Sequence, residues 1–325
     1  MLRNVSRTGR LTATVALGTT LALTLAACNR DSGGTDGEGG DGGAADGASV
    51  TLSLSTLNNP FFVDVRDGAQ SAADELGIEL EVVDAQNDST AEANQVANSV
   101  TGGAEGLIIN PVDSDAAGAG IGPAVQADLP VVAVDRAVNG AEVDSLVSSD
   151  NVAGGKQAAD ALAAAIGEKG EVIVLQGVAG TSASRDRGEG FAEGIAAYPD
   201  IEVVATQTAN FDRAEALDVA TNLLQSHPDA VGVFAENDEM ALGAVQALGD
   251  RAGDDVAVVG FDGTDDALAA VQEGTMVATI AQQPVELGKQ AVEVMSQVLA
   301  GESVDAEIPV PVETVTSDNV ADFVK

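Results

Sequence analysis

Apolar runs that alternate with helical patterns dominate the chain from residue 50 onward. Short segments rich in Val, Ile and Leu are typical of buried strands, while longer segments with apolar residues three and four positions apart are typical of amphipathic helices. The two kinds of segment follow one another with few exceptions. This alternation predicts parallel sheets with helices on both faces.

The pattern divides the chain into two successive series of such elements. Strands are expected at 50–56, 78–83, 106–109, 129–134, 143–147, 171–175, 201–206, 230–234, 256–260 and 276–280. Helices are expected at 63–76, 90–102, 115–127, 152–166, 182–197, 214–226, 239–248, 265–273 and 285–299, followed by a short extended tail.

The two series repeat the same order of strand ends. A strand that ends at Asn110 is followed by one that ends at Asp135, and Asn237 and Asp262 take the matching places in the second series. We therefore expect two similar α/β lobes whose strand ends point at a common cleft. A cleft between lobes is a favoured place for a small-molecule site.

The amino-terminal 28 residues have a different composition. Arg3, Arg7 and Arg10 precede an apolar stretch that is too short and too weakly apolar to predict a spanning helix, and the pattern is typical of a secretory signal. Cys28, the only cysteine, follows a small-residue pair and resembles the lipidated cysteine of the bacterial lipobox. Residues 1–28 are thus expected to be a lipoprotein signal peptide; an ordinary signal with an incidental cysteine is the alternative.

Residues 29–49 and the overall charge limit the partners. The 29–49 segment consists mostly of Gly, Asp, Ala and Ser, which predicts a flexible acidic tether to a soluble body outside the membrane. The whole chain has a net charge of −38. Nucleic acid and anionic lipid surfaces are therefore poor partners, because binding to phosphates needs clustered Lys and Arg.

Residues for catalysis or metal binding are scarce. With His227 as the only histidine and Cys28 as the only cysteine, neither a zinc site nor a Cys–His or Ser–His nucleophile is expected. The glycines between Gly188 and Gly194 resemble a dinucleotide fingerprint only superficially, because they lie inside a helical pattern. No metal, cofactor or enzymatic activity is predicted from the residues.

Polar side chains gather just after the expected strands, and two aromatic residues stand beside them. Asn59, Asn110, Asp135, Arg136, Asn237 and Asp262 supply donors and acceptors suited to the hydroxyls of a neutral polyol. Phe61 and Phe62 could bury the apolar faces of a sugar ring. The alternatives are that each Asn or Asp caps the next helix and that the two Phe fill the core.

Several sequence blocks resemble bacterial ribose-binding proteins. The blocks are Ser55–Phe62, Ile109–Asp115, Ser149–Lys156, Leu175–Phe191, Asn222–Asp229 and Gly260–Thr264. The similarity runs from about residue 50 to near the end of the chain. It implies the type I periplasmic binding protein fold, with two Rossmann-like lobes joined by a three-crossing hinge. The lobes would comprise residues 50–149 with 283–310, and 150–282 with 311–325, with crossings near residues 149–150, 282–283 and 310–311.

The resemblance also implies a ligand and a set of residues that bind it. The ligand would be a monosaccharide, with D-ribose first, captured by hinge closure and delivered by an anchored monomer to the permease of an ABC importer. The residues carried over are Asn59, Phe61, Phe62, Asn110, Asp135, Arg136, Arg187, Phe211, Asn237, Asp262 and Gln282. The two Phe would stack on one side of the sugar ring and Phe211 on the other.

The chain departs from the family pattern at two nearby places. Glu236 stands where the family usually has Gln, and Gln283-Pro284-Val285 replaces its usual Leu-Pro-Asp. Allose, galactose, xylose or a furanose signal therefore remain alternative ligands. The lobes also resemble effector domains of sugar-responsive repressors, which need a DNA-binding helix-turn-helix ahead of the lobes, where a signal peptide and a tether are expected here. A third alternative is an enzyme that acts on sugars, with Asp135 and Asp262 as its acid and base.

Overall fold

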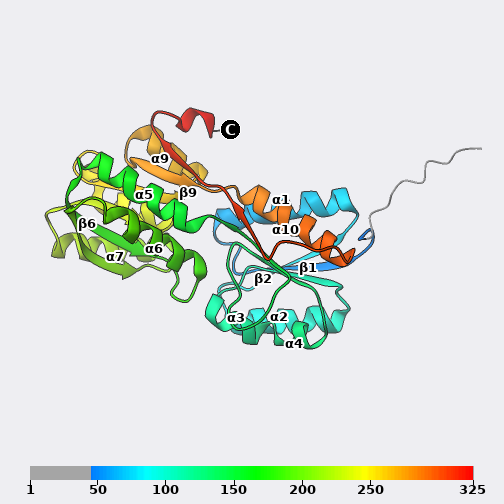
Figure 1. Ribbon diagram of the computed structural model, residues 1–325. Coiled ribbons are helices and arrows are strands. Elements are labelled where there is room, and N and C mark those ends of the chain that lie inside the picture. The colour runs from blue at the N-terminus through cyan, green and yellow to red at the C-terminus, as the bar shows by residue number, and fades with distance from the viewer. Residues whose placement is uncertain (1–44, 325) are drawn as a thin grey trace, which may run out of the picture. The chain divides into compact units, whose positions relative to one another are not determined.

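Two six-stranded sheets, each covered by helices, make up residues 45–324, the part of the chain that the computed structural model describes (Figure 1). The first sheet has the order β11-β5-β4-β3-β1-β2 and the second β12-β10-β9-β8-β6-β7. All neighbouring strands run parallel except the pair β10 and β12. Each strand of the first sheet has a counterpart at the same place in the second, for example β4 and β9, which confirms the expected repeat.

The first lobe contains the first sheet and five helices. Its strands are β1 (Ser49–Leu54), β2 (Glu79–Asp84), β3 (Gly106–Ile109), β4 (Val131–Val134), β5 (Ser145–Ser149) and β11 (Glu307–Val310). Its helices are α1 (Pro60–Leu76), α2 (Ser89–Gly102), α3 (Ser114–Gly120), α4 (Gly122–Gln126) and α10 (Pro284–Leu299). Helices α1 and α10 pack together on one face of the sheet, and α2, α3 and α4 cover the other.

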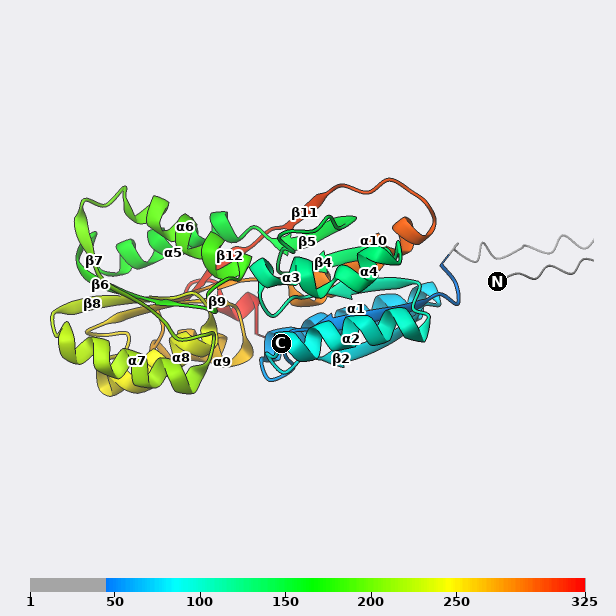
Figure 2. The same ribbon diagram turned by 90° about the horizontal axis from the view of Figure 1, so that it is seen from below.

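The second lobe contains the second sheet and the remaining elements. Its strands are β6 (Lys169–Gln176), β7 (Asp200–Thr208), β8 (Ala230–Ala235), β9 (Ala257–Asp262), β10 (Ala278–Ala281) and β12 (Glu313–Thr316). Its helices are α5 (Asn151–Ala165), α6 (Ser182–Ile195), α7 (Arg213–Ser226), α8 (Asp238–Leu248) and α9 (Asp265–Glu273), with short 3-10 turns at Gly249–Arg251 and Val320–Asp322. Helices α7, α8 and α9 lie side by side on one face of the sheet (Figure 2).

The chain passes between the lobes three times. It leaves the first sheet after β5, returns after β10 to form α10, and leaves again between β11 and β12. The expected fold class, two α/β lobes with a three-crossing hinge, is confirmed. Since each sheet buries one apolar layer on each face, each lobe has its own core.

Helix α1 begins three residues earlier than the pattern predicts. The Asn59 side chain accepts a hydrogen bond of 2.9 Å from the Phe61 N–H, and Pro60 occupies the first helical turn, where its missing N–H has no cost. Phe61 and Phe62 therefore lie in the first turn of α1 rather than before it.

Two further sequence expectations are wrong. The single helix expected at 115–127 is broken at the buried Ile121, because Gly122 and Pro123 follow and Pro123 cannot donate the helical hydrogen bond. The tether was expected to extend to residue 49, but Ala45 and Ala48 are buried and Ser49 begins β1. Methyl side chains are small enough to pack there. The rest of the tether and Cys28 lie outside the described residues.

Close helix packing explains the glycine-rich stretch that resembles a dinucleotide motif. Gly190 lies inside α6, and a Cβ on it would come 2.1 Å from the Val152 carbonyl oxygen of α5. A Cβ on Gly155 of α5 would come 2.3 Å from the Arg187 carbonyl oxygen of α6. These glycines let the two helices approach and place Arg187. Among the helices of residues 45–324, none is long and apolar enough to cross a membrane.

Candidate functional site

A small cavity lies between the lobes, at the carboxyl ends of the central strands, and is called the interlobe cavity here. Its volume is about 20 Å³, and it is lined by Asn59, Phe61, Phe62, Asp135, Arg136, Ala183, Arg187, Phe211, Asn237, Asp262 and Gln282. All the candidate residues named from the sequence are in this set except Asn110. Ala183 is the lining residue that sequence reasoning missed, because a methyl side chain carries no chemical signal.

The lobes are closed on each other in this structure. The Ala137 N–H of the first lobe donates to the Ser182 hydroxyl of the second at 2.8 Å, and the Ser182 N–H donates to the Ser114 hydroxyl at 3.0 Å. Both serines stand in the first turns of their helices, α3 and α6. The small volume of the interlobe cavity follows from this closure, since side chains of both lobes fill the space.

Asn110 lies behind Asp135, outside the cavity lining. Its amide group donates to an Asp135 carboxylate oxygen at 3.1 Å and to the Val134 carbonyl at 3.2 Å, and its oxygen accepts from the Ser55 hydroxyl at 2.6 Å. Asn110 is fully buried and its polar atoms are occupied. The geometry indicates that it holds Asp135 in place, whereas the sequence suggested a direct ligand contact.

Arg136 is held rigidly on the first-lobe side of the cavity. Its Nη1 donates to the carbonyls of Pro111 and Val112 at 3.0 and 3.3 Å. The loop that carries them is fixed in turn by Glu92, whose carboxylate accepts from the Val112 N–H at 2.7 Å. Sequence reasoning missed this role, because Glu92 lies within the helical pattern of α2 and far from any strand end.

Arg187 has the corresponding place in the second lobe. Its Nε donates to Asn151 at 2.8 Å, and its Nη1 donates to the Glu236 carbonyl at 2.7 Å. The same Nη1 lies 3.4 Å from Asp262, and the guanidinium stands 3.9 Å from the centre of the Phe261 ring. These contacts leave Arg187 only 3% exposed and aim it from α6 into the cavity.

Both site aspartates adopt a backbone conformation that non-glycine residues rarely have. Asp135 follows β4 with φ of +64°, and Asp262 ends β9 with φ of +131°. Because β4 and β9 hold equivalent positions in their sheets, the two carboxylates are placed in the same way by each lobe. Strained residues of this kind cluster at functional sites.

Asp238, which the sequence did not single out, supports the turn after Asp262. Its carboxylate accepts from the Gly263 and Thr264 N–H groups at 2.8 Å each and from the Thr279 hydroxyl at 2.7 Å. Asp238 is fully buried. It therefore fixes the strained backbone that presents Asp262.

Aromatic rings enclose the cavity from both lobes. Phe61 and Phe62 meet edge to face, with centroids 5.2 Å apart, and both are nearly fully buried in the first-lobe core. Phe211, in the second lobe, has φ of +59°. The Arg136 guanidinium lies 5.3 Å from the Phe62 ring centre and 5.7 Å from that of Phe211. The Phe pair thus fills the core and also lines the cavity, and its contact with a sugar ring stays a prediction.

The two site asparagines also serve as helix caps. Asn59 caps α1 as described above, and the Asn237 oxygen accepts from the Met240 N–H at 2.9 Å at the start of α8. The Asn237 amide lies 3.4 Å from the Phe211 carbonyl. Capping and cavity lining are therefore combined in these residues rather than being alternatives.

Three buried polar atoms of the lining make no hydrogen bond within the described residues. They are Asp135 Oδ1, Arg136 Nε and Gln282 Oε1. Buried polar groups are rarely left without a partner in folded proteins. Two acceptors and one donor on residues that line one cavity suit a ligand whose groups both donate and accept, as hydroxyls do.

The site carries two arginines opposite two aspartates. Burial raises the pKa of Asp135, and the nearby Arg136 and Arg187 act in the opposite direction. Burial likewise raises the pKa of Asp262 well above its ordinary value, against the attraction of Arg187. No cluster of metal-ligating side chains occurs among residues 45–324. The charged side chains of the site can donate and accept hydrogen bonds, and its rings offer flat apolar faces.

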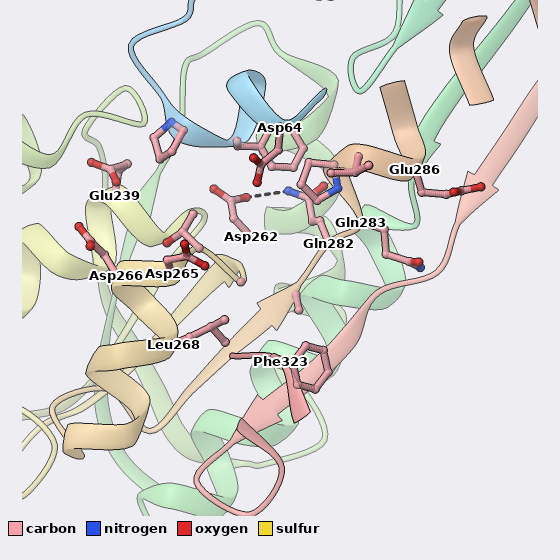
Figure 3. Close-up of a pocket in the computed structure, with 17 residues that line it drawn as sticks. Asp64, Glu239, Asp262, Asp265, Asp266, Leu268, Gln282, Gln283, Glu286 and Phe323 are labelled. Atoms are coloured by element: carbon pink, nitrogen blue, oxygen red, sulfur yellow. Dashed lines mark hydrogen bonds between the residues drawn. The ribbon is translucent and has the colours of Figure 1, made fainter. Parts of the chain in front are cut away.

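A larger cavity of about 530 Å³ adjoins the interlobe cavity and shares Phe61, Asp262 and Gln282 with it. Figure 3 shows the hydrogen bond from Gln282 to Asp262 in this cavity, with Asp265 of α9 and Glu286 of α10 around it. We place the candidate site in the smaller cavity, because the paired charges and the unpartnered buried atoms gather there. Volume alone does not identify a ligand site after the lobes have closed.

The free energy of unfolding is expected to fall as the pH rises from about 4 to 7. Burial raises the pKa of Glu236 to about 7 and that of Asp238 to about 7, whereas both would ionise near pH 4 in the unfolded chain. The stability that the neutral carboxyls provide is complete below about pH 4 and is lost as the pH rises through 7.

Glu236→Gln is expected to reduce this fall in the free energy of unfolding by about 3 kcal/mol, because the glutamine amide does not ionise. Denaturant unfolding of both proteins at several pH values measures the effect. An unchanged pH slope in the variant would show that Glu236 is ionised throughout.

Comparison with known proteins gives consistent matches. The family model described as "Periplasmic binding protein domain" matches residues 50–303. The "Ribose import binding protein RbsB" of Escherichia coli is 50% identical over 267 residues, which cover 82% of this chain and 90% of that protein.

Solved structures agree with the sequence matches. An ABC transporter solute binding protein from Bacillus halodurans with bound myo-inositol has a TM-score of 0.80 and 32% identity, covering 86% of this chain and 98% of that chain. One from Actinobacillus succinogenes with bound D-allose has a TM-score of 0.80 and 32% identity, covering 85% and 99%. The family model spans most of the two lobes, and this chain therefore belongs to the periplasmic binding protein domain family.

Proposed function

We propose that this protein is the extracytoplasmic sugar-binding component of an ABC importer and that it captures D-ribose between its lobes. The observation that carries the proposal concerns three residues that line one cavity together with aromatic rings. Their atoms Asp135 Oδ1, Arg136 Nε and Gln282 Oε1 are buried and have no hydrogen-bond partners within the described residues. The 50% identity to a ribose import binding protein supports ribose as the sugar.

The charged and the aromatic residues of the site have different roles in the proposed recognition. The carboxylates of Asp135 and Asp262 accept hydrogen bonds from sugar hydroxyls, and Arg136 and Arg187 donate to hydroxyl oxygens. Hydrogen bonds to charged groups contribute about 1.5–3 kcal/mol each, roughly twice a neutral pair. The Phe pair and Phe211 bury the apolar faces of the ring from opposite lobes.

Closure of the lobes is the proposed capture step. The three chain crossings form the hinge, and the closed form is stabilised by contacts between lobes such as those of Ser182 with Ser114 and Ala137. A ligand that bonds to both lobes favours the closed form by the difference between its affinities for the two states. The closed form would then deliver the sugar to the permease.

A different monosaccharide is the second candidate, because one similar solved structure holds D-allose and another holds the cyclic polyol myo-inositol. Titration calorimetry against ribose, allose, galactose and xylose decides between them. We expect ribose to bind most tightly. Tighter binding of another sugar of the panel would keep the transport role and change its ligand, whereas no heat with ribose at millimolar concentration would refute the leading choice.

Gly177→Ala is expected to weaken sugar binding about tenfold while changing stability little. A Cβ at Gly177 would come 2.0 Å from the tip of the Phe211 ring, which must therefore move within the cavity. Calorimetry with the sugar, alongside thermal unfolding of the ligand-free variant, measures both effects. Binding equal to that of the wild type would mean that the position of the Phe211 ring does not matter for the ligand.

The lipid anchor on Cys28 is part of the proposal and rests on the sequence alone. Cys28→Ala is expected to release the protein from the membrane fraction, because a lipidated cysteine would be its attachment. Fractionation of expressing cells with an antibody to the folded lobes measures this. A variant that stays in the membrane fraction as fully as the wild type would contradict the anchor.

A further inference from the structure

Two serines join the lobes directly at a place outside the interlobe cavity. The Ala137 N–H of the first lobe donates to the Ser182 hydroxyl of the second at 2.8 Å, and the Ser182 N–H donates to the Ser114 hydroxyl of the first at 3.0 Å. Neither serine is among the residues that line the interlobe cavity. The two bonds therefore belong to the contact between the lobes and not to the wall of the sugar site.

Both serines are shielded from water in the closed form. Ser114 is fully buried and Ser182 is 5% exposed. The turn before Ser182 fits closely against the first lobe, since a Cβ on Gly180 would come 2.7 Å from the Asp113 carboxylate. The Ala137 and Ser182 N–H groups have no other acceptor among the described residues. Opening of the lobes therefore exchanges both bonds for bonds to water.

Each lobe holds its own half of this contact with bonds that do not involve the other lobe. In the first lobe, the Asn139 N–H donates to the Ser114 carbonyl at 2.8 Å, which ties the start of α3 to the loop between β4 and β5. In the second lobe, the Thr181 hydroxyl donates to the Val178 carbonyl at 2.8 Å and closes the turn that leads to Ser182. Little further ordering is needed when the two halves meet, so most of the free energy of these bonds favours closure.

A contact of this kind acts on the equilibrium between the open and closed forms and not on the sugar. A sugar that is held by both lobes binds to the closed form, and its apparent affinity is scaled by the share of the protein that can adopt that form. Groups that line the cavity change the affinity differently for each sugar, because they touch its hydroxyls. Groups outside the cavity change it by one common factor.

We propose that Ser114 and Ser182 form a latch between the lobes and set the affinity of the site for all of its sugars without contacting any of them. The proposal rests on the proposed function, since it requires that the sugar is held in the closed form. Arg185 and Asp115, 4.0 Å apart, also join the lobes, but this pair is exposed and is screened by water and salt. The latch bonds are neutral and buried, so their effect is expected to be independent of salt.

Sugar titrations of the wild type, Ser182→Ala and Ser114→Ala test this. Ser182→Ala leaves the Ala137 N–H without an acceptor in the closed form, and Ser114→Ala does the same to the Ser182 N–H. We expect each variant to weaken ribose binding about tenfold, and the double variant to weaken it further. Every other sugar that the wild type binds should weaken by the same factor.

The rate of sugar release gives a second measurement, which does not need several sugars. Radiolabelled ribose should leave Ser182→Ala about tenfold faster than the wild type, because opening breaks one bond fewer, and the association rate should change little. Ser99→Ala is the matched control, since Ser99 is 8% exposed and its hydroxyl donates to the Gln95 carbonyl of the same helix. It should bind and release ribose as the wild type does.

The outcomes separate the latch from the proposed function. Affinities and release rates equal to those of the wild type in both serine variants overturn the latch and leave sugar capture standing. Losses that differ between sugars, or that also appear in Ser99→Ala, overturn it as well, because they point to contact with the sugar or to general destabilisation. Should another sugar of the panel bind in place of ribose, the same variants and criteria apply to it. Absence of binding by every sugar of the panel overturns both.

Discussion

Replacing Arg187 with alanine is expected to abolish measurable ribose binding and to lower the free energy of unfolding by about 3–5 kcal/mol. The side chain is only 3% exposed, and its removal leaves Asn151, the Glu236 carbonyl and Asp262 without their shared donor. Removing one partner of a buried ion pair leaves the other charge uncompensated. Denaturant unfolding and ribose calorimetry measure the two effects.

Arg185→Ala is the matched control for this change. Arg185 lies two positions earlier on α6, is half exposed and stands 4.0 Å from Asp115 of the first lobe. An exposed pair of this kind contributes about 0–1 kcal/mol. The control should stay stable and bind ribose within a few-fold of the wild type. If Arg187→Ala behaved like the control, Arg187 would have no role in the site or in the stability of the lobe.

Phe61→Ala is expected to lower the free energy of unfolding by about 3–5 kcal/mol and to weaken ribose binding at least tenfold. The ring is 4% exposed, packs edge to face on Phe62, and lines the interlobe cavity. Its loss opens space in the first-lobe core and removes one wall of the site. Binding is measured under conditions in which the variant remains folded.

Phe191→Ala is the control that separates the effect of a buried ring on stability from its effect on ribose binding. Phe191 is 2% exposed, stacks on Phe234 with centroids 4.4 Å apart, and does not line the interlobe cavity. This control should lose a similar amount of stability and, once folded, bind ribose as the wild type does. An equal loss of affinity in both variants would mean that Phe61 acts on binding only through the stability of the lobe.

The architecture and most of the cavity lining could be predicted from the sequence. The repeated order of strand ends at Asn110, Asp135, Asn237 and Asp262 reflects real equivalence of β3 with β8 and of β4 with β9. Parallel strands bring their carboxyl ends to one edge, so residues far apart in sequence meet there. The resemblance then added Arg187, which α6 carries to the same edge and which no strand end marks.

The residues that hold the cavity lining in place from behind could not be predicted from the sequence. Glu92 and Asp238 act through hydrogen bonds to backbone N–H groups far away in sequence, and no residue pattern reports such contacts. Asn110 directly follows β3, which is the position that Glu236 rather than Asn237 holds after β8, and it bonds to Asp135 behind the cavity. The early start of α1 depends on the Asn59 cap, and the burial of Ala45 and Ala48 depends on their small side chains. Neither is marked by the periodic pattern of apolar residues.

A crystal structure of the protein grown with D-ribose tests the central claim most directly. We predict a ribose between the Phe61–Phe62 pair and Phe211, with its hydroxyls bonded to Asp135, Arg136, Arg187, Asp262 and Gln282, and the three atoms that lack partners hydrogen-bonded. Ribose bound elsewhere, or none in the interlobe cavity at saturating concentration, would contradict the account.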